Sequence, residues 1–494
     1  MAPVNWADYA GTSGLGMTEK AGIHAGIHSM ADVDSLNKAL SAGSDINNPG
    51  AAPGEGFPLR VESLDATLFT TTFLAKDIRF WKALYKDKAY NTIEEYNRLE
   101  EYGSGDAIYI AEGDLPDEDD STYSRQYTRI KFMGVTRRVT HVMSTVSTAH
   151  GDAVARETTN GTLWLLRQME PALFTGNEDL IGIQFDGLET LMVKAYNSTL
   201  SDDGQYLGYE DDNVIDLRGE ALTEDHVTDL CERLVAEPNF GSPTSLWLPT
   251  GPMKDLSKLM FPRGRHMQNP GADGEFGVAV RAVLTPFGRI SLEPDIFIPQ
   301  SKLPAANGAG QQSVRPGAPT VTVAPAAAAY AGGNQTFWSD ADAGTYIYRV
   351  VAGSRYGRSA PVTTASVAVA ADEAVTFTVS DAGPNTSYYI IYRTEAGGVA
   401  GTAREIMRVP RTGATQVITD LNRFLPNCQK GYMLDVNPEV IKWKQLAPFT
   451  KIPLATIDTS VRWMMVLYGA LQLQKPKQAG MFINIGPLRT GAYA

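Results

Sequence analysis

One stretch of the sequence constrains the fold more than any other, the segment HGDAVARETTNGTLWLLRQMEPALFTGN at residues 150–177. Its apolar and small side chains recur close to every 3.6 residues, at Val154, Thr158, Leu165, Met169 and Ala172, and the same face is widened by Trp164, Leu166 and Leu173. This period predicts a long amphipathic helix with one buried side. Asp152 and Glu157 stand towards its start, where the helix dipole favours negative charge. Pro171 and then Gly176 are predicted to end it.

Length and charge narrow the classes of protein. The chain has 494 residues, so we expect two to four domains. The formal net charge of −13 argues against electrostatic binding to nucleic acid, because no basic surplus exists to displace counterions from phosphates. Two cysteines, Cys231 and Cys428, are too few for a disulfide framework. Cys231 falls on the apolar face of a predicted helix, which favours a buried thiol.

Residues 1–62 are rich in Gly, Ala, Ser and Asp and have no sustained period, which predicts an extended or flexible arm. A short repeat places His24 and His28 four residues apart, a spacing that can hold a metal on a helix. The Gly-rich setting favours incidental histidines instead. The chain opens without a basic and apolar leader and has no apolar run of about 18 residues, so we expect neither a secretory signal nor a membrane span.

Residues 63–103 are predicted to begin a globular domain. A dense apolar group there is expected in the core: Phe73, Leu74, Ile78, Phe80, Trp81 and Leu84. Asn91 followed by Glu94 resembles a capping box, which predicts a helix ending by Gly103.

Residues 104–147 predict a long charged hairpin. The run Ala107–Ile110 leads into an acidic turn, with Glu112, Asp114, Asp117, Glu118, Asp119 and Asp120. The β-like return run is basic, with Arg125, Arg129, Lys131, Arg137 and Arg138. An acidic tip and a basic strand are suited to pairing with a neighbouring molecule. The alternative is a solvated hairpin whose charges satisfy one another.

An α+β or α/β block follows the long helix. Residues 182–193 predict a strand or turn entering a short helix. Thr223 is the predicted N-cap of a further helix, and a strand (245–249), a helix (253–261) and a strand (289–299) come after it. One acidic loop lacks the spacing of a calcium-binding loop and is predicted to be solvated, with Asp202, Asp203, Asp211 and Asp212.

The composition changes after Lys302, because no lysine recurs until Lys430. A linker rich in Ala, Gly, Gln and Pro opens the segment, and short β runs follow at 320–323, 344–352, 365–369, 374–379, 387–393, 405–409 and 416–418. About seven short strands over about 109 residues predict an immunoglobulin-like sandwich. The runs TYIYRVVAGSRYGRSAPV and YYIIYRT resemble strands of fibronectin type III modules. Lysine-bearing sequence resumes afterwards, so we expect an insertion in another domain.

The tyrosines of this segment suggest a second hypothesis, weak binding to glycans or host surfaces. They offer a sugar-stacking platform, although packing in the core or across strands is favoured for most of them, and they are Tyr346, Tyr348, Tyr356, Tyr388, Tyr389 and Tyr392.

Residues 430–494 return to the main fold, with Trp463–Leu471 as a predicted buried strand or strand pair. The sequence has no G-x-S-x-G elbow, phosphate-binding loop, H-E-x-x-H motif or paired-cysteine metal site. His141, His150 and His226 fall in segments that strand or helix packing explains. We therefore predict a structural or binding protein, not an enzyme, and no cofactor.

The order of these elements resembles the major capsid protein of tailed bacteriophages, notably the helix ending LLRQMEPALFTGN and the FDGL shortly after it. The resemblance implies an α+β capsid fold with an inserted all-β sandwich. Its parts would be an N-terminal arm (1–62), the start of the peripheral domain (63–103), the E-loop hairpin (104–147), the peripheral domain with the spine helix (148–220), the axial domain (221–302), the inserted immunoglobulin-like domain with linkers (303–429) and a C-terminal return to both domains (430–494).

The resemblance also implies a function without catalysis, in the virion and without a membrane. Copies of the chain would assemble into hexamers and pentamers of an icosahedral head around double-stranded DNA, which they contact without specificity. The hairpin would lie over a neighbouring subunit, and the inserted domain would face outwards. A scaffolding protein and a portal are implied as partners, with cement proteins left open. Some members cross-link a lysine to an asparagine; Lys131 lies near the hairpin, but no partner is identified. We expect no cleavage of the arm.

Two rival functions remain at this point. A phage tail protein or surface adhesin would use the immunoglobulin-like domain for recognition and would show a repeat pattern elsewhere, which the sequence lacks. A polysaccharide-active enzyme would need paired carboxylates in a cleft, whereas the acidic residues here cluster in loops.

Overall fold

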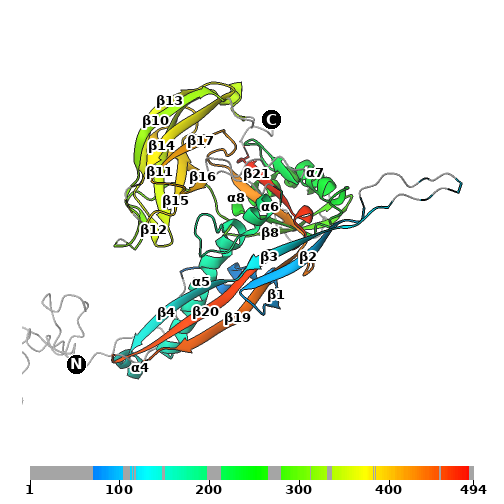
Figure 1. The fold of residues 1–494 in the computed structure, drawn as a ribbon. Coiled ribbons are helices and arrows are strands. Elements are labelled where there is room, and N and C mark those ends of the chain that lie inside the picture. The colour runs from blue at the N-terminus through cyan, green and yellow to red at the C-terminus, as the bar shows by residue number, and fades with distance from the viewer. Residues whose placement is uncertain are drawn as a thin grey trace, which may run out of the picture. The chain divides into compact units, whose positions relative to one another are not determined.

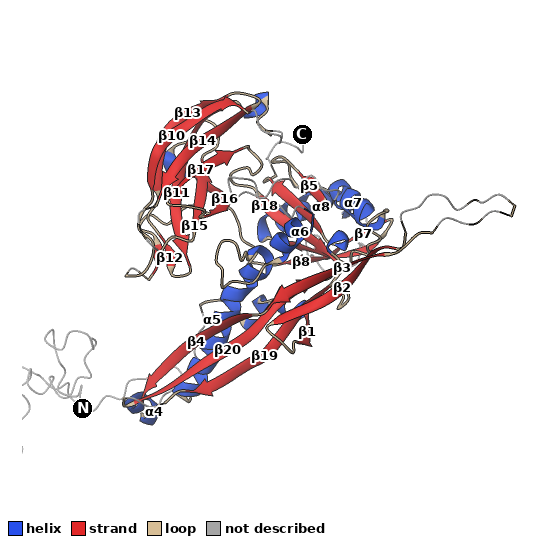
Figure 2. Cartoon of the chain, viewed as in Figure 1, coloured by secondary structure: helices blue, strands red, loops and turns tan. Residues whose placement is uncertain are grey.

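The structure of the chain is a computed structural model, and it describes residues 71–103, 118–146, 151–196, 213–264, 280–311, 313–330, 336–381, 385–455 and 458–488, with 109, 112–113, 115 and 383. Some predictions fall outside these residues. They concern the arm with His24 and His28, the hairpin residues Asp114 and Asp117, His150, and the loop residues Asp202, Asp203, Asp211 and Asp212. Figure 1 colours the described elements along the chain, and Figure 2 marks helices and strands.

A four-stranded sheet carries the long helix. Its order is β1 (Tyr85–Lys88), β19 (Ile441–Pro453), β20 (Ser460–Leu473) and β4 (Lys131–Thr140). β1 is parallel to β19, and the other neighbours are antiparallel. The predicted buried strand in the C-terminal segment is therefore confirmed as part of β20. A short helix, α4 (His141–Thr145), follows β4, so His141 begins a helix and not a strand. The long helix α5 lies along this sheet (Figure 1).

The long helix α5 spans Ala153–Thr175, which confirms the prediction from its period. Asp152 is the N-cap, and its carboxylate accepts the backbone N–H groups of Val154 at 3.0 Å and Ala155 at 3.3 Å. The buried face consists of Gly161, Leu165, Met169, Glu170, Leu173 and Phe174.

Pro171 does not end α5, contrary to the prediction. A proline inside a helix removes one N–H donor, and here the helix continues for another turn. The hydroxyl of Thr175 donates to the carbonyl of Pro171 at 3.2 Å, and the side chains of Leu173 and Phe174 are fully buried. Tertiary packing of this last turn therefore outweighs the local signal. The helix ends at Gly176, where a Cβ would lie 2.5 Å from the carbonyl oxygen of Ala172.

The predicted helix at 91–103 is wrong, because this segment is a β-strand. β2 (Ile93–Glu101) pairs antiparallel with β3 (Thr122–Arg129), and together they form the charged hairpin. Glu94 does accept the N–H groups of Tyr90 at 2.5 Å and Asn91 at 3.1 Å, but these bonds close the turn before the strand. The strand that pairs with β3 is thus 93–101, and most of the predicted run at 107–110 lies outside the described residues. The return run also divides, since β4 pairs with β20.

A second sheet contains six strands. Its order is β5 (Val214–Asp216), β21 (Gly480–Ile485), β18 (Gln429–Leu434), β6 (Ser245–Leu248), β8 (Gly288–Pro294) and β7 (Ala282–Thr285). The helices α6 (Leu188–Tyr196), α7 (Glu224–Val235) and α8 (Thr250–Gly264) belong to the same block, near the predicted positions. The two sheets, the long helix α5, the short helix α3 (Phe80–Ala83) and these three helices are called the body below.

Helix α7 confirms the sequence reading at residue level. Thr223 accepts the N–H of His226 at 3.3 Å, and the Nδ1 atom of His226 accepts the N–H of Thr223 at 3.3 Å, so the histidine completes a capping box. The thiol of Cys231 is fully buried, with its Sγ atom 3.5 Å from the sulfur of Met433. Burial raises the pKa of Cys231 to about 11.

The strands between residues 309 and 420 form a two-sheet β-sandwich. One sheet has the order β10 (Thr320–Ala329), β14 (Glu373–Ser380), β17 (Thr415–Asp420). The other has β16 (Arg404–Pro410), β15 (Tyr388–Arg393), β11 (Gly344–Ser354), β12 (Gly357–Arg358) and β9 (Ala309–Gly310), with β13 (Val362–Val369) also on β11. Each of the seven predicted β runs lies in one of these strands or overlaps it. The predicted linker is partly a strand, because β9 pairs with β12.

The remaining short elements are helical. They are α3 (Phe80–Ala83) and the 3-10 turns η3 (Ala75–Asp77), η5 (Asp340–Asp342), η6 (Ala400–Thr402) and η7 (Pro476–Gln478).

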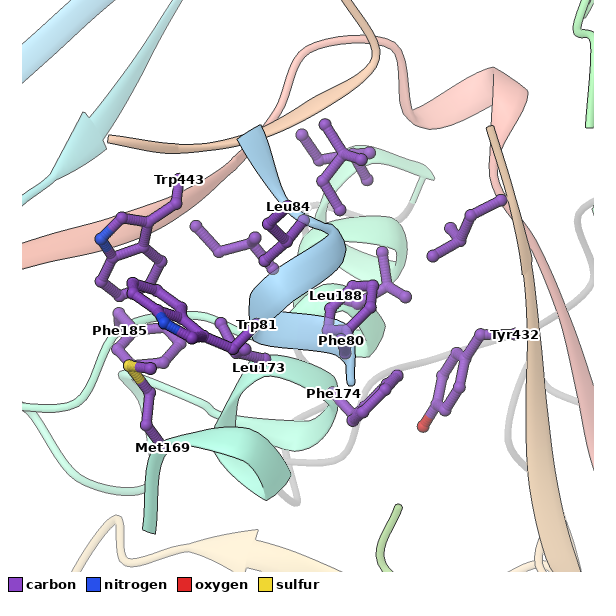
Figure 3. Packing of buried hydrophobic residues seen from close by; sticks show 14 of the residues in the cluster. Phe80, Trp81, Leu84, Met169, Leu173, Phe174, Phe185, Leu188, Tyr432 and Trp443 are labelled. Carbon is purple, nitrogen blue, oxygen red and sulfur yellow. The ribbon is translucent and has the colours of Figure 1, made fainter. Parts of the chain in front are cut away.

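Aromatic side chains join distant parts of the body into one core (Figure 3). Phe80 stacks on Phe174 of α5 at 4.6 Å between ring centroids and meets the edge of Trp247 at 5.0 Å. Trp81 packs edge-on against Trp443 at 5.0 Å. The predicted core group at 73–84 is therefore largely confirmed, although Leu74 is 43% exposed.

Candidate assembly surface

The basic residues of the hairpin run are mostly engaged within their own chain. Lys131 Nζ lies 2.8 Å from Glu178 Oε1, and an Arg129 Nη atom lies 3.1 Å from the same oxygen. Burial opposes ionisation of Glu178, but the bonds from these two cations outweigh it and hold the pKa of Glu178 below its ordinary value. Lys131 Nζ also donates to the carbonyl of Gly182 at 2.8 Å.

The other three basic residues have partners too. Arg125 pairs across the hairpin with Glu95 at 3.3 Å, Arg137 pairs with Glu157 of α5 at 3.5 Å, and Arg138 pairs with Asp458 at 3.6 Å. The structure therefore brings the basic residues to carboxylates of the same subunit. Most of these pairs are partly exposed, and such pairs contribute about 0–1 kcal/mol each to stability.

The described acidic residues of the hairpin loop do not line a closed site. Glu112, Glu118, Asp119 and Asp120 are exposed. Asp119 lies close to Gly103, where a Cβ would come 2.3 Å from the Asp119 carboxylate. The described carboxylates of this loop are therefore accessible to solvent.

The inner face of the hairpin is fastened to the body. The hydroxyl of Tyr96 donates to the carbonyl of Leu473 at 3.1 Å, and Nε of Arg98 donates to the carbonyl of Gln474 at 3.0 Å. Burial raises the pKa of Tyr96 above its ordinary value. These bonds tie β2 to the end of β20, so the hairpin leaves the body from a fixed base.

The outer face of the hairpin exposes apolar side chains in the register of the two strands. Leu99 stands opposite Tyr123, and Glu95 stands opposite Tyr127. Tyr123 is 70% exposed and Tyr127 is 61% exposed, with Ile93 at 51% on the same face. Sequence reasoning missed this face, although the alternation Tyr123, Arg125, Tyr127 was the available signal. A row of exposed rings and aliphatic groups is suited to burial against another molecule.

A second group of exposed apolar side chains lies at α4. Val142 is 72% exposed, Met143 48% and Val146 56%. They follow the end of β4, whose partner strand β20 exposes Val461 nearby in the register. This group also went unnoticed in the sequence, because a five-residue helix carries too short a period to reveal its faces.

The favoured core packing of the sandwich tyrosines is confirmed, and the hypothesis of a sugar-stacking platform is wrong. Five of its six members are buried, namely Tyr346, Tyr348, Tyr388, Tyr389 and Tyr392, and Tyr356 is half-buried. Tyr348 donates its hydroxyl to Asp420 at 2.8 Å inside the sandwich. These rings fill the core, so they cannot stack on a sugar.

A cavity of about 200 Å³ lies where the sandwich joins the body. Its charged walls pair with each other, since Lys430 binds Glu189 and Arg408 lies 2.6 Å from Glu405. Its lining includes Cys428 but no histidine, and burial raises the pKa of Cys428 to about 12. The cavity therefore lacks an activated nucleophile.

Metal and membrane sites can be searched only where the structure describes the chain. In that part, no group of three or more His, Cys, Asp or Glu side chains is arranged to hold a metal ion. The described helices include none that is long and apolar enough to cross a membrane.

Comparison with known proteins gives the family. The chain is 24% identical over 451 residues to the major capsid protein of Staphylococcus phage S25-3, covering 86% of this chain and 90% of that protein. The same figures hold for the major capsid protein of Staphylococcus phage K. The solved capsid structure of cyanophage P-SCSP1u is similar at 9% identity and a TM-score of 0.44, covering 90% of this chain and 99% of that chain, which is too distant to define the fold. The model of the SU10 major capsid protein family matches residues 53–308, more than half of the chain. The chain therefore belongs to the SU10 major capsid protein family, whose members are structural, non-enzymatic proteins of the phage virion.

Proposed function

We propose that this capsid protein builds its shell from hexamers and pentamers, and that the β2–β3 hairpin lies over a neighbouring subunit as an E-loop. Self-association follows from membership of a capsid family; the hairpin contact is the finer part of the proposal. The observation that carries it is the exposed outer face of the hairpin, with Tyr123, Tyr127 and Ile93 uncovered in the single chain.

We propose that fewer of the charged hairpin residues contact a neighbouring subunit than the sequence predicted. Arg129 and Lys131 pair with Glu178 of their own subunit, so we assign them to fixing the base of the hairpin. Arg137 pairs with Glu157 and ties β4 to α5. The contact with the neighbour falls to the apolar outer face, to Arg125 and to the exposed acidic residues, among them Glu112, Glu118, Asp119 and Asp120. Asp114, Asp117 and Arg138 remain predicted contact residues. Repetition of a weak contact around a closed shell makes the shell strong.

The test is the double variant Tyr123→Ser/Tyr127→Ser in the full chain. We expect a folded subunit, because both rings are exposed, and a loss of closed shells, because each ring buried at a contact contributes on the order of 1–2 kcal/mol. Sedimentation and electron microscopy measure the yield of shells. The matched control, Val323→Ser/Val417→Ser, removes exposed apolar groups from the sandwich and should assemble normally. Shells of the hairpin variant at the yield of the unaltered protein would contradict the proposal.

We also propose that the sandwich is an immunoglobulin-like domain on the outer face of the shell. The chain enters it after β8 and leaves it before β18, and it has its own apolar core, with Val350, Phe377 and Ile391 among its members. An independent core permits an insertion that leaves the body sheets to make the shell contacts.

The position of the sandwich can be tested by labelling intact shells. Glu395 is exposed in the loop after β15, and Glu395→Cys introduces a reactive thiol there. A maleimide on a protein-sized polymer, too large to pass through the shell, should label this cysteine in closed shells as fully as in free subunits. Labelling of free subunits alone would place the sandwich inside or at a contact, against the proposal.

The remaining partners stay predictions from the family. They are a scaffolding protein, a portal, cement proteins and packaged DNA held without sequence specificity. The rival function of a tail or adhesin protein gains nothing from the family match.

A further inference from the structure

Two carboxyl groups meet inside the body without a cation between them. Glu170 belongs to α5, and Asp295 follows the end of β8. Both residues are 0% exposed, and their carboxyl groups interact with each other. Among the described residues, neither carboxylate forms an ion pair with a lysine or an arginine.

Glu170 is already saturated with backbone donors. Its Oε1 atom accepts the N–H groups of Arg79 at 3.0 Å and Phe80 at 2.7 Å, and its Oε2 atom accepts that of Trp81 at 3.2 Å. These bonds hold residues 79–81, which precede β1, against the C-terminal part of α5. An ionised Glu170 has no proton to donate to Asp295.

Asp295 has one satisfied oxygen and one that lacks a donor. Its Oδ1 atom accepts the N–H of Phe297 at 2.7 Å, whereas Oδ2 is buried without a hydrogen-bond donor. Two ionised carboxylates would place two negative charges together in apolar surroundings, which is strongly unfavourable. A single proton held between Glu170 and Asp295 removes one charge and supplies the missing donor.

The charged groups around the pair do not replace this proton. Lys86 on β1 attracts Glu170 from a distance, but its Nζ atom donates to the carbonyls of Trp81 and Leu84. Arg79 attracts Asp295, but its guanidinium lies 3.7 Å from Glu293 at the surface. Burial first, and the charge of Asp295 second, raise the pKa of Glu170 to about 8, and burial raises the pKa of Asp295.

We propose that Glu170 and Asp295 share one proton as a pH-sensitive latch, which holds α5, residues 79–81 and the end of β8 together and opens in mildly alkaline solution. The three segments are the long helix, the start of α3 and the end of a strand of the six-stranded sheet. Opening the latch loosens the junction between them within one subunit. The inference stands without the proposed hairpin contact, because it concerns the isolated chain.

The direction of the pH effect follows from proton binding. In the unfolded chain Glu170 releases its proton near its ordinary pKa of 4.5, whereas in the folded chain it keeps the proton up to about pH 8. The stabilisation by the shared proton is therefore complete below pH 4.5, is lost progressively as the pH rises to about 8, and is absent above it.

The test compares the full chain with Asp295→Asn. The asparagine keeps the shape, its amide nitrogen donates to Glu170, and its oxygen accepts the N–H of Phe297, so this variant has the latch without a proton to lose. We measure thermal unfolding between about pH 5 and about pH 9. The unaltered chain should lose several degrees more than Asp295→Asn across this range, and the neighbouring surface variant Glu293→Gln should follow the unaltered chain. Parallel curves for the unaltered chain and Asp295→Asn would overturn the proposal.

Infrared spectroscopy provides a readout that does not depend on the variant folding well. At neutral pH, carboxyl groups with ordinary pKa values are ionised, so a carbonyl band of a protonated carboxyl marks the shared proton. The band should be present in the unaltered chain at neutral pH and vanish above about pH 9. Asp435→Asn is the control, because burial also raises the pKa of Asp435, and the band should persist in it. A spectrum of the unaltered chain without such a band would overturn the proposal.

Discussion

Arg218 Nη2 lies 3.1 Å from Asp342 Oδ2, and this ion pair joins the body to the inserted sandwich. The same guanidinium donates to the backbone carbonyls of Asn422 and Phe337, both at 2.8 Å. The backbone of Arg218 is held in the left-handed region, at φ 46°, by the bond from its N–H to Asp216 at 2.9 Å. One side chain in an uncommon backbone conformation thus contacts the connection between β10 and β11 and the segment that leaves the sandwich after β17.

We predict that Arg218→Ala loosens the sandwich without unfolding it. The variant loses charge-assisted hydrogen bonds to two carbonyls, and since the side chain is partly exposed the docking should weaken by about 2 kcal/mol. Limited proteolysis should cut near residues 303–316 or 421–428 faster than in the unaltered chain. Arg355→Ala, at an exposed arginine elsewhere in the sandwich, is the control. Equal cleavage rates for the two variants would count against a clasp at Arg218.

A second arginine is predicted to hold the sandwich itself together. Arg393 is 1% exposed, lies 2.6 Å from Asp420, donates to Asn422 Oδ1 at 2.6 Å, and packs over the ring of Trp338. Arg393→Met leaves Asp420 as a buried charge with the Tyr348 hydroxyl as a remaining partner, which should cost about 3–5 kcal/mol of stability.

Unfolding in denaturant measures the stability of the sandwich in the full chain. It is followed by the fluorine NMR signal of fluorotryptophan at position 338. Trp338 is the single tryptophan between Lys302 and Lys430, so its signal reports this domain. Arg355→Met serves as a surface control and should change the stability by no more than about 0.5 kcal/mol. A loss for Arg393→Met as small as that of the control would show that the buried pair contributes little.

The elements that the sequence predicted well are those with a strong local period. Helix α5, helix α7 and the strands of the sandwich carry their buried faces in consecutive residues, so pattern alone locates them. The predicted N-cap residue of α7, Thr223, is also confirmed, because its hydroxyl oxygen accepts the N–H of His226.

The elements that the sequence missed depend on distant partners. Residues 93–101 are rich in glutamate and favour a helix locally, yet pairing with β3 and the bonds from Tyr96 and Arg98 to the end of β20 make them a strand. Exposure of Tyr123 and Tyr127 likewise depends on which face of the hairpin meets the body. No local pattern distinguishes Glu170, because its partner Asp295 is 125 residues away in the sequence. The mixture of helices and strands was readable from pattern, whereas the exposed face of the hairpin and the buried carboxyl pair were not.

Gly161 is predicted to set how closely α5 approaches the sheet. A Cβ at this position would lie 2.1 Å from Met465 Cε and 3.1 Å from Arg137 Nε. Gly161→Ala should be nearly neutral, because the helix gains about 1 kcal/mol of propensity while the flexible end of Met465 shifts. Gly161→Val should cost about 1–3 kcal/mol through overpacking. Thermal unfolding of both variants, with Thr159→Val on the exposed face of α5 as control, tests the contact; equal stability of Gly161→Val and the control would refute it.

Both native cysteines are predicted to be silent towards thiol reagents in the folded chain. Cys231 is fully buried, and burial raises the pKa of Cys231 to about 11 and that of Cys428 to about 12. At pH about 8, no more than about one thiol in a thousand is then ionised, and the thiolate is the reactive form. A colorimetric thiol assay should therefore detect almost no reaction in the native chain and two thiols per chain in denaturant. The exposed variant Glu395→Cys should add one rapidly reacting thiol under native conditions, which controls for reagent quality. Fast native labelling at Cys428 would mean that the junction between the sandwich and the body opens in solution. The same assay on the Arg218→Ala variant would then show whether the Arg218 contacts control that opening.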